Sequence, residues 1–135
     1  MLWRSRYEPK ILRNVELPER LPDGIVLAAF DPKGLGEVSL WLRLVDSAGL
    51  LEKTQVIVFG DLQELPRIKL LLPKSLHDQL VVRKDVEGKW ARLIEPDTAA
   101  RAFSIVSRRG VAELIVTGPP TEDVWEEFER IACLP

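Results

Sequence analysis

Few side chains in this sequence could carry out chemistry. The candidates for a nucleophile or a base are Ser39, His77 and Cys133, and the histidine and the cysteine are the only ones of their kind. A single cysteine excludes an intramolecular disulfide and a paired-cysteine redox motif. One cysteine and one histidine are also too few for an ordinary zinc site, which recruits several such ligands. We therefore expect neither a metal nor a cofactor.

A hydrolase triad would have to combine Ser39 and His77 with an aspartate, either Asp61 or Asp85. The sequence argues against it, because no GxSxG elbow surrounds the serine. The lone histidine lies in a Leu-His-Asp stretch that is typical of a surface turn. We therefore expect structural roles for these residues.

The stretch Gly34-Leu-Gly36-Glu-Val-Ser39 resembles a dinucleotide-binding fingerprint between a strand and a helix. In that fingerprint the glycines begin where the strand ends. Here three residues, Asp31 to Lys33, intervene. We interpret the stretch as a flexible loop before a helix. An anion could still bind there, because free N–H groups at a helix N-terminus and a nearby lysine attract negative charge.

The elements that would position these residues follow from the apolar pattern. The continuous apolar run Gly24–Phe30 predicts a strand buried on both faces, and Gln55–Phe59 predicts a second one. Between them, residues Val38–Leu51 have apolar side chains at helical spacing. Strand, helix and strand form a βαβ unit, whose crossover should be right-handed.

The rest of the chain predicts further α/β structure. Two β-rich runs around Arg108-Arg109-Gly110 predict an antiparallel hairpin, and Thr121 is placed to cap a closing helix. We expect that the two arginines form a solvated hairpin tip. The tryptophans Trp41, Trp90 and Trp125 fit packing better than a cofactor role. The remaining predicted elements are a short helix over Leu62–Leu72, a strand over Gln79–Val82, an irregular stretch with a helical turn over Val86–Pro96, strands over Ala102–Ser107 and Val111–Thr117, and a helix from Thr121.

Length and composition indicate one α/β domain spanning residues 1–135. A charged N-terminal arm over residues 1–15 would be anchored by Trp3 and Tyr7. The net charge of −2 gives no drive toward nucleic acid or an anionic membrane. The sequence has no signal peptide pattern and no apolar run long enough for a membrane span, so we expect a cytoplasmic protein. Scarce asparagine and methionine beside abundant charge fit a thermophile, or a GC-rich coding bias.

Three segments together resemble the peroxiredoxins, the AhpC/TSA-type branch of the thioredoxin-like superfamily. The first follows the first buried strand: Pro32 matches the family's proline, while Gly36 stands at its threonine position and Ser39 at its peroxide-reactive cysteine. The second is Val81–Gly88, similar to the family's strand-Asp-x-x-Gly stretch. The third begins at Arg101 and resembles the Arg-x-x-Phe-x-Ile-Asp-x-x-Gly hairpin. The resemblance implies a thioredoxin-like fold with a central mixed sheet flanked by helices.

The same resemblance implies that the family's chemistry is lost. A peroxiredoxin attacks peroxide with a thiolate that a helix N-terminus and a guanidinium stabilise. The hydroxyl of Ser39 is far harder to ionise, and Gly36 offers no hydroxyl to position the peroxide. We therefore expect a non-catalytic redoxin-like domain.

Such a domain would bind a protein partner or a small anion through the old active-site face, and it could form a homodimer. The residual anion pocket would comprise Pro32, Gly36, Ser39 and Arg101. Alternatively, Arg101 pairs with a carboxylate such as Glu37 or Asp97. The competing hypothesis is a thiol-based oxidoreductase or peroxidase-related enzyme. It would act through Cys133 as an exposed thiol, or through a mechanism that needs no cysteine, whereas Cys133 is otherwise a small apolar residue near the chain end.

Overall fold

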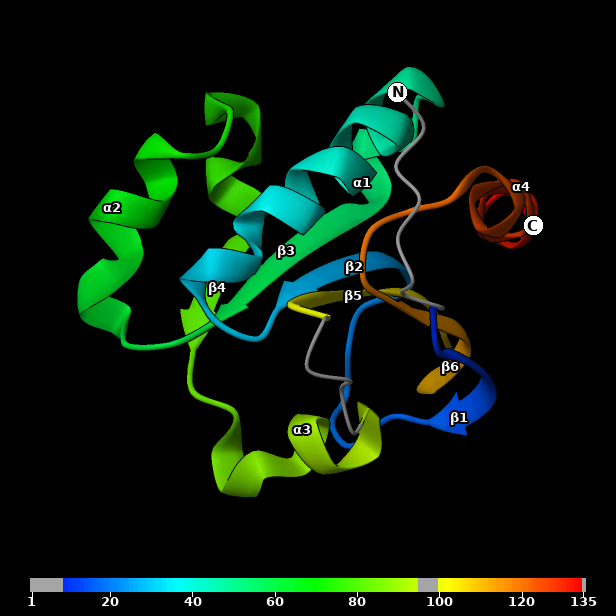
Figure 1. The fold of residues 1–135 in the computed structure, drawn as a ribbon, viewed down its shortest axis with the longest axis horizontal. Helices are drawn as coiled ribbons and strands as arrows, with labels where there is room; N and C mark the ends of the chain where they lie inside the picture. Colours follow the sequence, from blue (N-terminus) through cyan, green and yellow to red (C-terminus); the bar gives the residue numbers. More distant parts are fainter. Residues whose placement is uncertain (1–8, 95–99, 135) are drawn as a thin grey trace.

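The computed structural model describes residues 9–94 and 100–134. Six strands form one mixed sheet in the order β1-β6-β5-β2-β3-β4 (Figure 1). The strands are β1 (Ile11–Glu16), β2 (Gly24–Ala29), β3 (Thr54–Phe59), β4 (Leu80–Arg83), β5 (Ala102–Arg108) and β6 (Val111–Thr117). The helices are α1 (Leu35–Ser47), α2 (Leu65–Leu70), α3 (Lys89–Ile94) and α4 (Glu122–Ala132). The 3-10 turns are η1 (Pro32–Gly34), η2 (Leu51–Lys53), η3 (Leu62–Glu64), η4 (Lys74–Gln79) and η5 (Val86–Gly88).

The centre of the sheet confirms the predicted βαβ unit. Strands β2 and β3 pair in parallel with α1 between them, and β4 continues the parallel part. Strands β5 and β6 form the predicted antiparallel hairpin, and β5 pairs with β2. Strand β2 contributes alternate residues to apolar clusters on both faces of the sheet, because it lies in the middle. Its apolar run therefore did indicate a strand buried on both sides.

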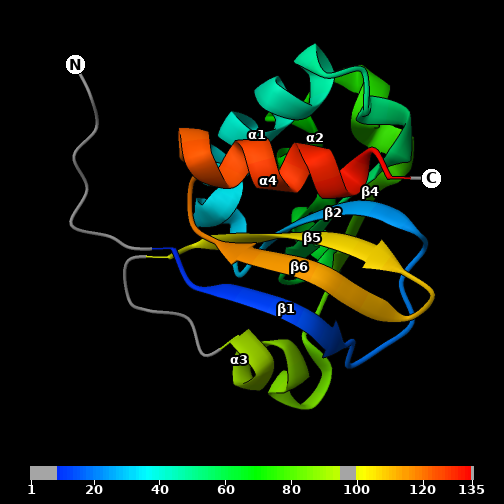
Figure 2. The same ribbon diagram turned by 90° about the vertical axis from the view of Figure 1, so that its right-hand side faces the viewer.

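Helices cover the two faces unequally. Figure 2 shows α1, α2 and α4 on one face of the sheet and α3 on the other. The larger cluster, under α1 and α4, contains Trp41 and Phe128, and the smaller one contains Trp90 and Phe103. Trp41 and Trp90 are fully buried, as the packing interpretation predicted. Within the residues described, no helix has both the length and the apolar content to span a bilayer.

Helix α1 begins earlier and ends earlier than its apolar spacing predicts. The carboxylate of Asp31 accepts a hydrogen bond from the Lys33 backbone N–H (2.7 Å), and the turn η1 leads directly into the helix. The helix ends before Gly49, which has a φ of +72°. Ser39 is therefore the fifth residue of α1, one turn beyond its start. The apolar stripe could not reveal this, because the first turn contains Gly36 and Glu37.

Part of the predicted N-terminal arm is the edge strand β1, antiparallel to β6. All six of its residues are at least partly exposed, so the segment lacks the apolar signal of an inner strand. Lys10 begins the pairing: its backbone N–H donates to the hydroxyl of Thr117 at 2.9 Å. Trp3 and Tyr7 lie outside the described residues. Thr121 does occupy the N-cap position of α4, but its side chain makes no capping hydrogen bond.

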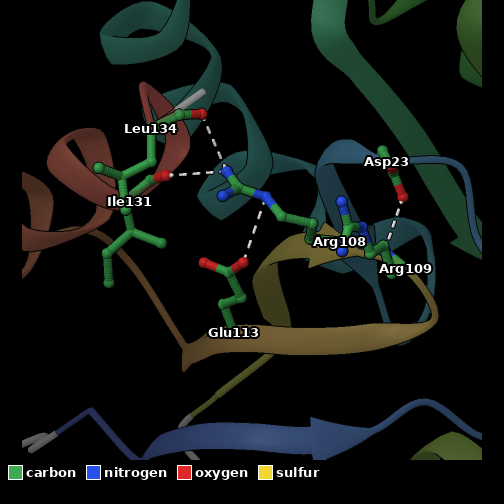
Figure 3. A network of polar contacts seen from close by, with 6 residues as sticks. All are labelled: Asp23, Arg108, Arg109, Glu113, Ile131 and Leu134. Atoms are coloured by element: carbon green, nitrogen blue, oxygen red, sulfur yellow. Dashed lines mark hydrogen bonds and ion pairs between the residues drawn. The ribbon is translucent and has the colours of Figure 1, made fainter.

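The hairpin between β5 and β6 turns through Arg109 and Gly110, both with positive φ, which is the geometry of a type I′ turn. The prediction of two solvated arginines holds for Arg109 but is wrong for Arg108, which is half-buried. The Nε atom of Arg108 lies 3.2 Å from a carboxylate oxygen of Glu113. One of its terminal nitrogens donates to the carbonyl of Leu134 at 3.0 Å, beyond the end of α4 (Figure 3). The side chain thus ties the hairpin to the C-terminal end of α4, where exposed carbonyls attract a cation.

Candidate functional site

The candidate site lies at the N-terminal end of α1, where this helix meets the start of β5. The segment that leads into α1 is in direct backbone contact with the residue before β5: the N–H of Phe30 donates to the carbonyl of Arg101 at 3.0 Å. Gly34, the last residue before α1, is buried against the same carbonyl. A Cβ atom at Gly34 would lie 2.2 Å from the Arg101 carbonyl oxygen. A glycine is therefore required here for close approach of two backbones rather than for a flexible loop.

Glu37 links the two segments through its side chain. It lies in the first turn of α1, where a negative charge is favoured by the helix dipole. Its Oε1 atom accepts hydrogen bonds from the backbone N–H groups of Arg101 (3.1 Å) and Ala102 (3.0 Å). Ala102 is buried, so this carboxylate satisfies a donor that water could not easily reach. The backbone N–H groups of Arg101 and Ala102 are thus already hydrogen-bonded by Glu37.

The environment shifts the titration of Glu37. Burial raises the pKa of its carboxyl above the ordinary value of 4.5. The two backbone N–H donors and the charge of Arg101 oppose this effect and only partly offset it. The folded protein therefore holds a proton on Glu37 more readily than the unfolded chain does.

We expect that replacing Glu37 by alanine lowers the free energy of unfolding by about 1–3 kcal/mol, because it leaves the buried N–H of Ala102 without an acceptor. Glu37→Gln keeps an acceptor oxygen and should cost less. Because the folded-state pKa of the wild type is raised, its stability falls as pH rises from 4.5 through that raised value. The stability of the glutamine variant relative to wild type should therefore increase with pH over this window. Urea denaturation at a series of acidic to neutral pH values measures both effects, and equal losses for Ala and Gln would contradict the proposed link.

Ser39 faces a different part of the surface. It is half-buried and lines a groove of about 320 Å³ between α1 and the segment that follows α2. Neither Gly36 nor Arg101 lines that groove; Gly36 is exposed near the start of α1, and Arg101 is exposed at the start of β5. The fold therefore brings Pro32, Gly36 and Arg101 to the end of α1, while the serine side chain borders the groove.

The two carboxylates suggested for Arg101 have different outcomes. Glu37 does contact this residue, but through the backbone N–H of Arg101. Asp97 lies outside the described residues. The role of Glu37 could have been inferred from its place as an acid near a helix start, but its acceptance of the β5 donors depends on a contact between distant segments.

Cys133 is exposed at the C-cap of α4. Arg108, at the far end of β5 from Ala102, contacts carbonyls in this C-terminal segment. At about 3.3 Å per residue, the length of β5 places the N-terminal end of α1 roughly 20 Å from this C-terminal segment. Catalytic thiolates are typically found at helix N-termini or beside cations that stabilise them, whereas a C-cap is the opposite end of a helix. Cys133 therefore belongs to another region of the molecule than Ser39.

The remaining triad candidates have structural partners. The Nε2 atom of His77 lies 2.8 Å from the carbonyl oxygen of Lys69, to which it can donate. The carboxylate of Asp85 accepts from the backbone N–H groups of Trp90 and Ala91 at 3.0 Å, at the start of α3. Asp61 forms an exposed ion pair with Lys84. Within the part of the chain that the structure describes, no group of three or more His, Cys, Asp or Glu side chains could hold a metal ion.

Comparisons with known proteins extend the description of the fold. No protein-family model and no curated protein sequence matches this chain. Among solved structures, it is similar to a protein from Chlorobium tepidum described as a thiol:disulfide interchange protein, DsbE. The likeness covers 91% of this chain and 98% of that chain, with a TM-score of 0.53 and 14% sequence identity. It shows that this chain has a thioredoxin-like fold.

Proposed function

We propose that this protein is a non-catalytic thioredoxin-like domain, a degenerate relative of the peroxiredoxins, that binds a protein partner through the face of α1 bearing Ser39. One observation carries this proposal. In the N-terminal turns of α1, where the resemblance places a reactive thiol, the chain has Gly36 and Ser39. There the carboxylate of Glu37 accepts hydrogen bonds from the backbone N–H groups of Arg101 and Ala102.

A small anion is the less favoured ligand of this end of α1. The protein groups that bind such an anion most strongly would be free backbone N–H donors beside a cation. The donors of Arg101 and Ala102 are already bound by Glu37, whose negative charge would repel a second anion at close range. A surface that binds a macromolecule does not need these donors, so the partner we propose is a protein.

The competing function is a thiol enzyme that uses the exposed Cys133. We expect that the purified protein, mixed with hydrogen peroxide and a thiol reductant, consumes peroxide no faster than the reductant alone. We expect the same of insulin disulfide reduction. The reason is that the only thiol lies at the C-cap of α4, far from the N-terminal end of α1, and that the chain has no cysteine pair to exchange with an insulin disulfide.

Cys133→Ser is the matched control for these assays, because it removes the only sulfhydryl at an exposed position. Peroxide loss or insulin reduction that is present in the wild type and vanishes in this variant would overturn the non-catalytic proposal. Activity that persists in the variant would instead indicate a mechanism that needs no cysteine, and it would equally contradict the proposal.

A further inference from the structure

Strand β1 is one of the two edge strands of the sheet. Within residues 9–94 and 100–134 it pairs with β6 alone (Figure 2). The outer edge of such a strand presents N–H and C=O groups with no partner in the sheet, and a strand from another copy of the chain can bind to them. A regular, exposed edge strand is therefore prone to self-association unless its pairing groups are interrupted.

The side chains of β1 do not alternate regularly between the two faces of the sheet. Leu12 and Val15 both pack against the smaller apolar cluster although they are three residues apart. In a regular strand, side chains return to the same face at every second residue. Between the two, Arg13 forms an ion pair with Glu127 of α4, on the other face. The residue that resets the alternation is Asn14, whose φ of +52° lies in the left-handed region.

The neighbouring strand β6 contains a matching irregularity. Ala112 and Ile115 are also three residues apart, and both belong to the smaller cluster. Between them, the pairing of β6 with β5 passes from Leu114 directly to Ala112 and skips Glu113. Glu113 is therefore the extra residue of a β-bulge. In the register of β1 with β6 it lies opposite Asn14, so each of the two strands contains one added residue at the same level.

The backbone hydrogen bonds at the two ends of β1 show what the added residue does to its outer edge. Before the strand, the carbonyl of Lys10 accepts from the end of β6; after it, the N–H of Leu17 donates to the β5–β6 turn. In a regular antiparallel strand, residues that bond to the same neighbour are an even number of positions apart, but these two are an odd number apart. The adjacent residues Ile11 and Glu16, whose backbone groups point outward, are therefore out of phase as well. A straight strand could pair with one end of this edge but not with both.

We propose that the paired bulge at Asn14 and Glu113 protects the β1 edge from pairing with a second copy of this chain. The inference is independent of the proposed function. Strand addition requires a continuous row of donors and acceptors at regular spacing, and the bulge interrupts that row in the middle of β1. Asn14 is exposed, and asparagine adopts the left-handed conformation more readily than most residues, so the irregularity costs the fold little.

The test is the deletion of both Asn14 and Glu113 from the full-length protein. The deletion restores regular pairing of β1, β6 and β5, and the apolar side chains of these strands keep their faces, so the domain should still fold. Analytical ultracentrifugation at a series of concentrations should show self-association at least about tenfold tighter than that of the wild type. The matched control, Asn14→Gly/Glu113→Ala, removes the same two side chains but keeps both residues, and glycine tolerates the positive φ. It should sediment as the wild type does.

Three results would overturn the proposal. The first is a double deletion that is folded by circular dichroism and associates no more tightly than the wild type. The second is a double deletion that is unfolded, which would assign the bulge to folding of the hairpin and not to protection of the edge. The third comes from the wild type alone, whose Ile11 and Glu16 amides should exchange hydrogen rapidly at every protein concentration. Exchange that slows as the concentration rises would show that the edge already pairs with a second copy.

Discussion

Replacing Trp41 by alanine is expected to lower the free energy of unfolding by about 3–5 kcal/mol, which is the usual loss for a large aromatic side chain removed from a core. Trp41 is fully buried in the cluster between α1, α4 and the sheet. Its ring lies 4.9 Å from that of Phe128 and 6.3 Å from that of Trp125, measured between centroids. Since whole domains are stable by only about 5–15 kcal/mol, this single change should remove a large part of the protein's stability.

Two companion variants separate the contributions of Trp41. The indole N–H donates to the carbonyl of Gly118 at 2.8 Å, at the junction between β6 and α4. Trp41→Phe keeps an aromatic ring but removes this donor, and it should cost about 1–3 kcal/mol because the carbonyl is left buried and unbonded. Trp125→Ala removes a half-exposed ring from the same cluster and should cost less than Trp41→Ala. Urea denaturation followed by circular dichroism measures all three, and a loss below that of Trp125→Ala would show that Trp41 is not the anchor of α1.

The second large effect is expected from Gly34→Ala. The added Cβ atom would lie 2.2 Å from the backbone oxygen of Arg101 and 2.9 Å from the Cβ of Ala29. Both contacts are with groups that cannot rotate away, so η1 must move from the start of β5. Overpacking of this kind costs about 1–3 kcal/mol and sometimes more. The backbone of Gly34 is already helical, with a φ of −73°, so the overlap alone decides the sign.

Gly36→Ala is the control for this prediction. A Cβ at Gly36 would meet no atom within 4 Å, and alanine is a better helix former than glycine by about 0.5–1 kcal/mol. We therefore expect the melting temperature to fall in Gly34→Ala and to stay equal or rise in Gly36→Ala. A similar change of melting temperature in both variants would mean that Gly34, before the N-terminal end of α1, does not pack tightly against Arg101. Glu37 bridges the same contact. Loss of the contact in Gly34→Ala should therefore also weaken the pH dependence of stability that Glu37 causes.

The Gly34 and Glu37 predictions concern the N-terminal end of α1, near which the resemblance to peroxiredoxins expects a reactive thiol. The contacts there are structural: one glycine allows close approach and one carboxylate satisfies two backbone donors. If the proposed binding function is right, variants of the groove should alter partner binding without loss of stability, whereas Gly34→Ala and Trp41→Ala should lower stability. That contrast separates the surface that recognises a partner from the framework that holds it.

The sequence alone determined most of the secondary structure of this protein. Continuous apolar runs identify β2 and β3 because a central strand buries both of its faces, and helical spacing identifies α1 and α4 because each buries one face. The glycine in the Arg-Arg-Gly turn indicated the β5–β6 hairpin, because a tight two-residue turn needs positive φ. The edge strand β1 was missed, since an exposed edge does not require an apolar pattern.

The contacts at the candidate site, in contrast, arise from the folding of distant segments against one another. Glu37 and Ala102 are far apart in the chain, so no local sequence pattern indicates that the Glu37 carboxylate accepts a hydrogen bond from the backbone N–H of Ala102. The same holds for Gly34 beside Arg101 and for Arg108 beside the end of α4. Local propensities act over a turn or a strand, whereas these contacts arise when the sheet brings the end of one element against the start of another. The sequence therefore determined which side chains stand near the N-terminal end of α1, and the fold determined which groups they contact.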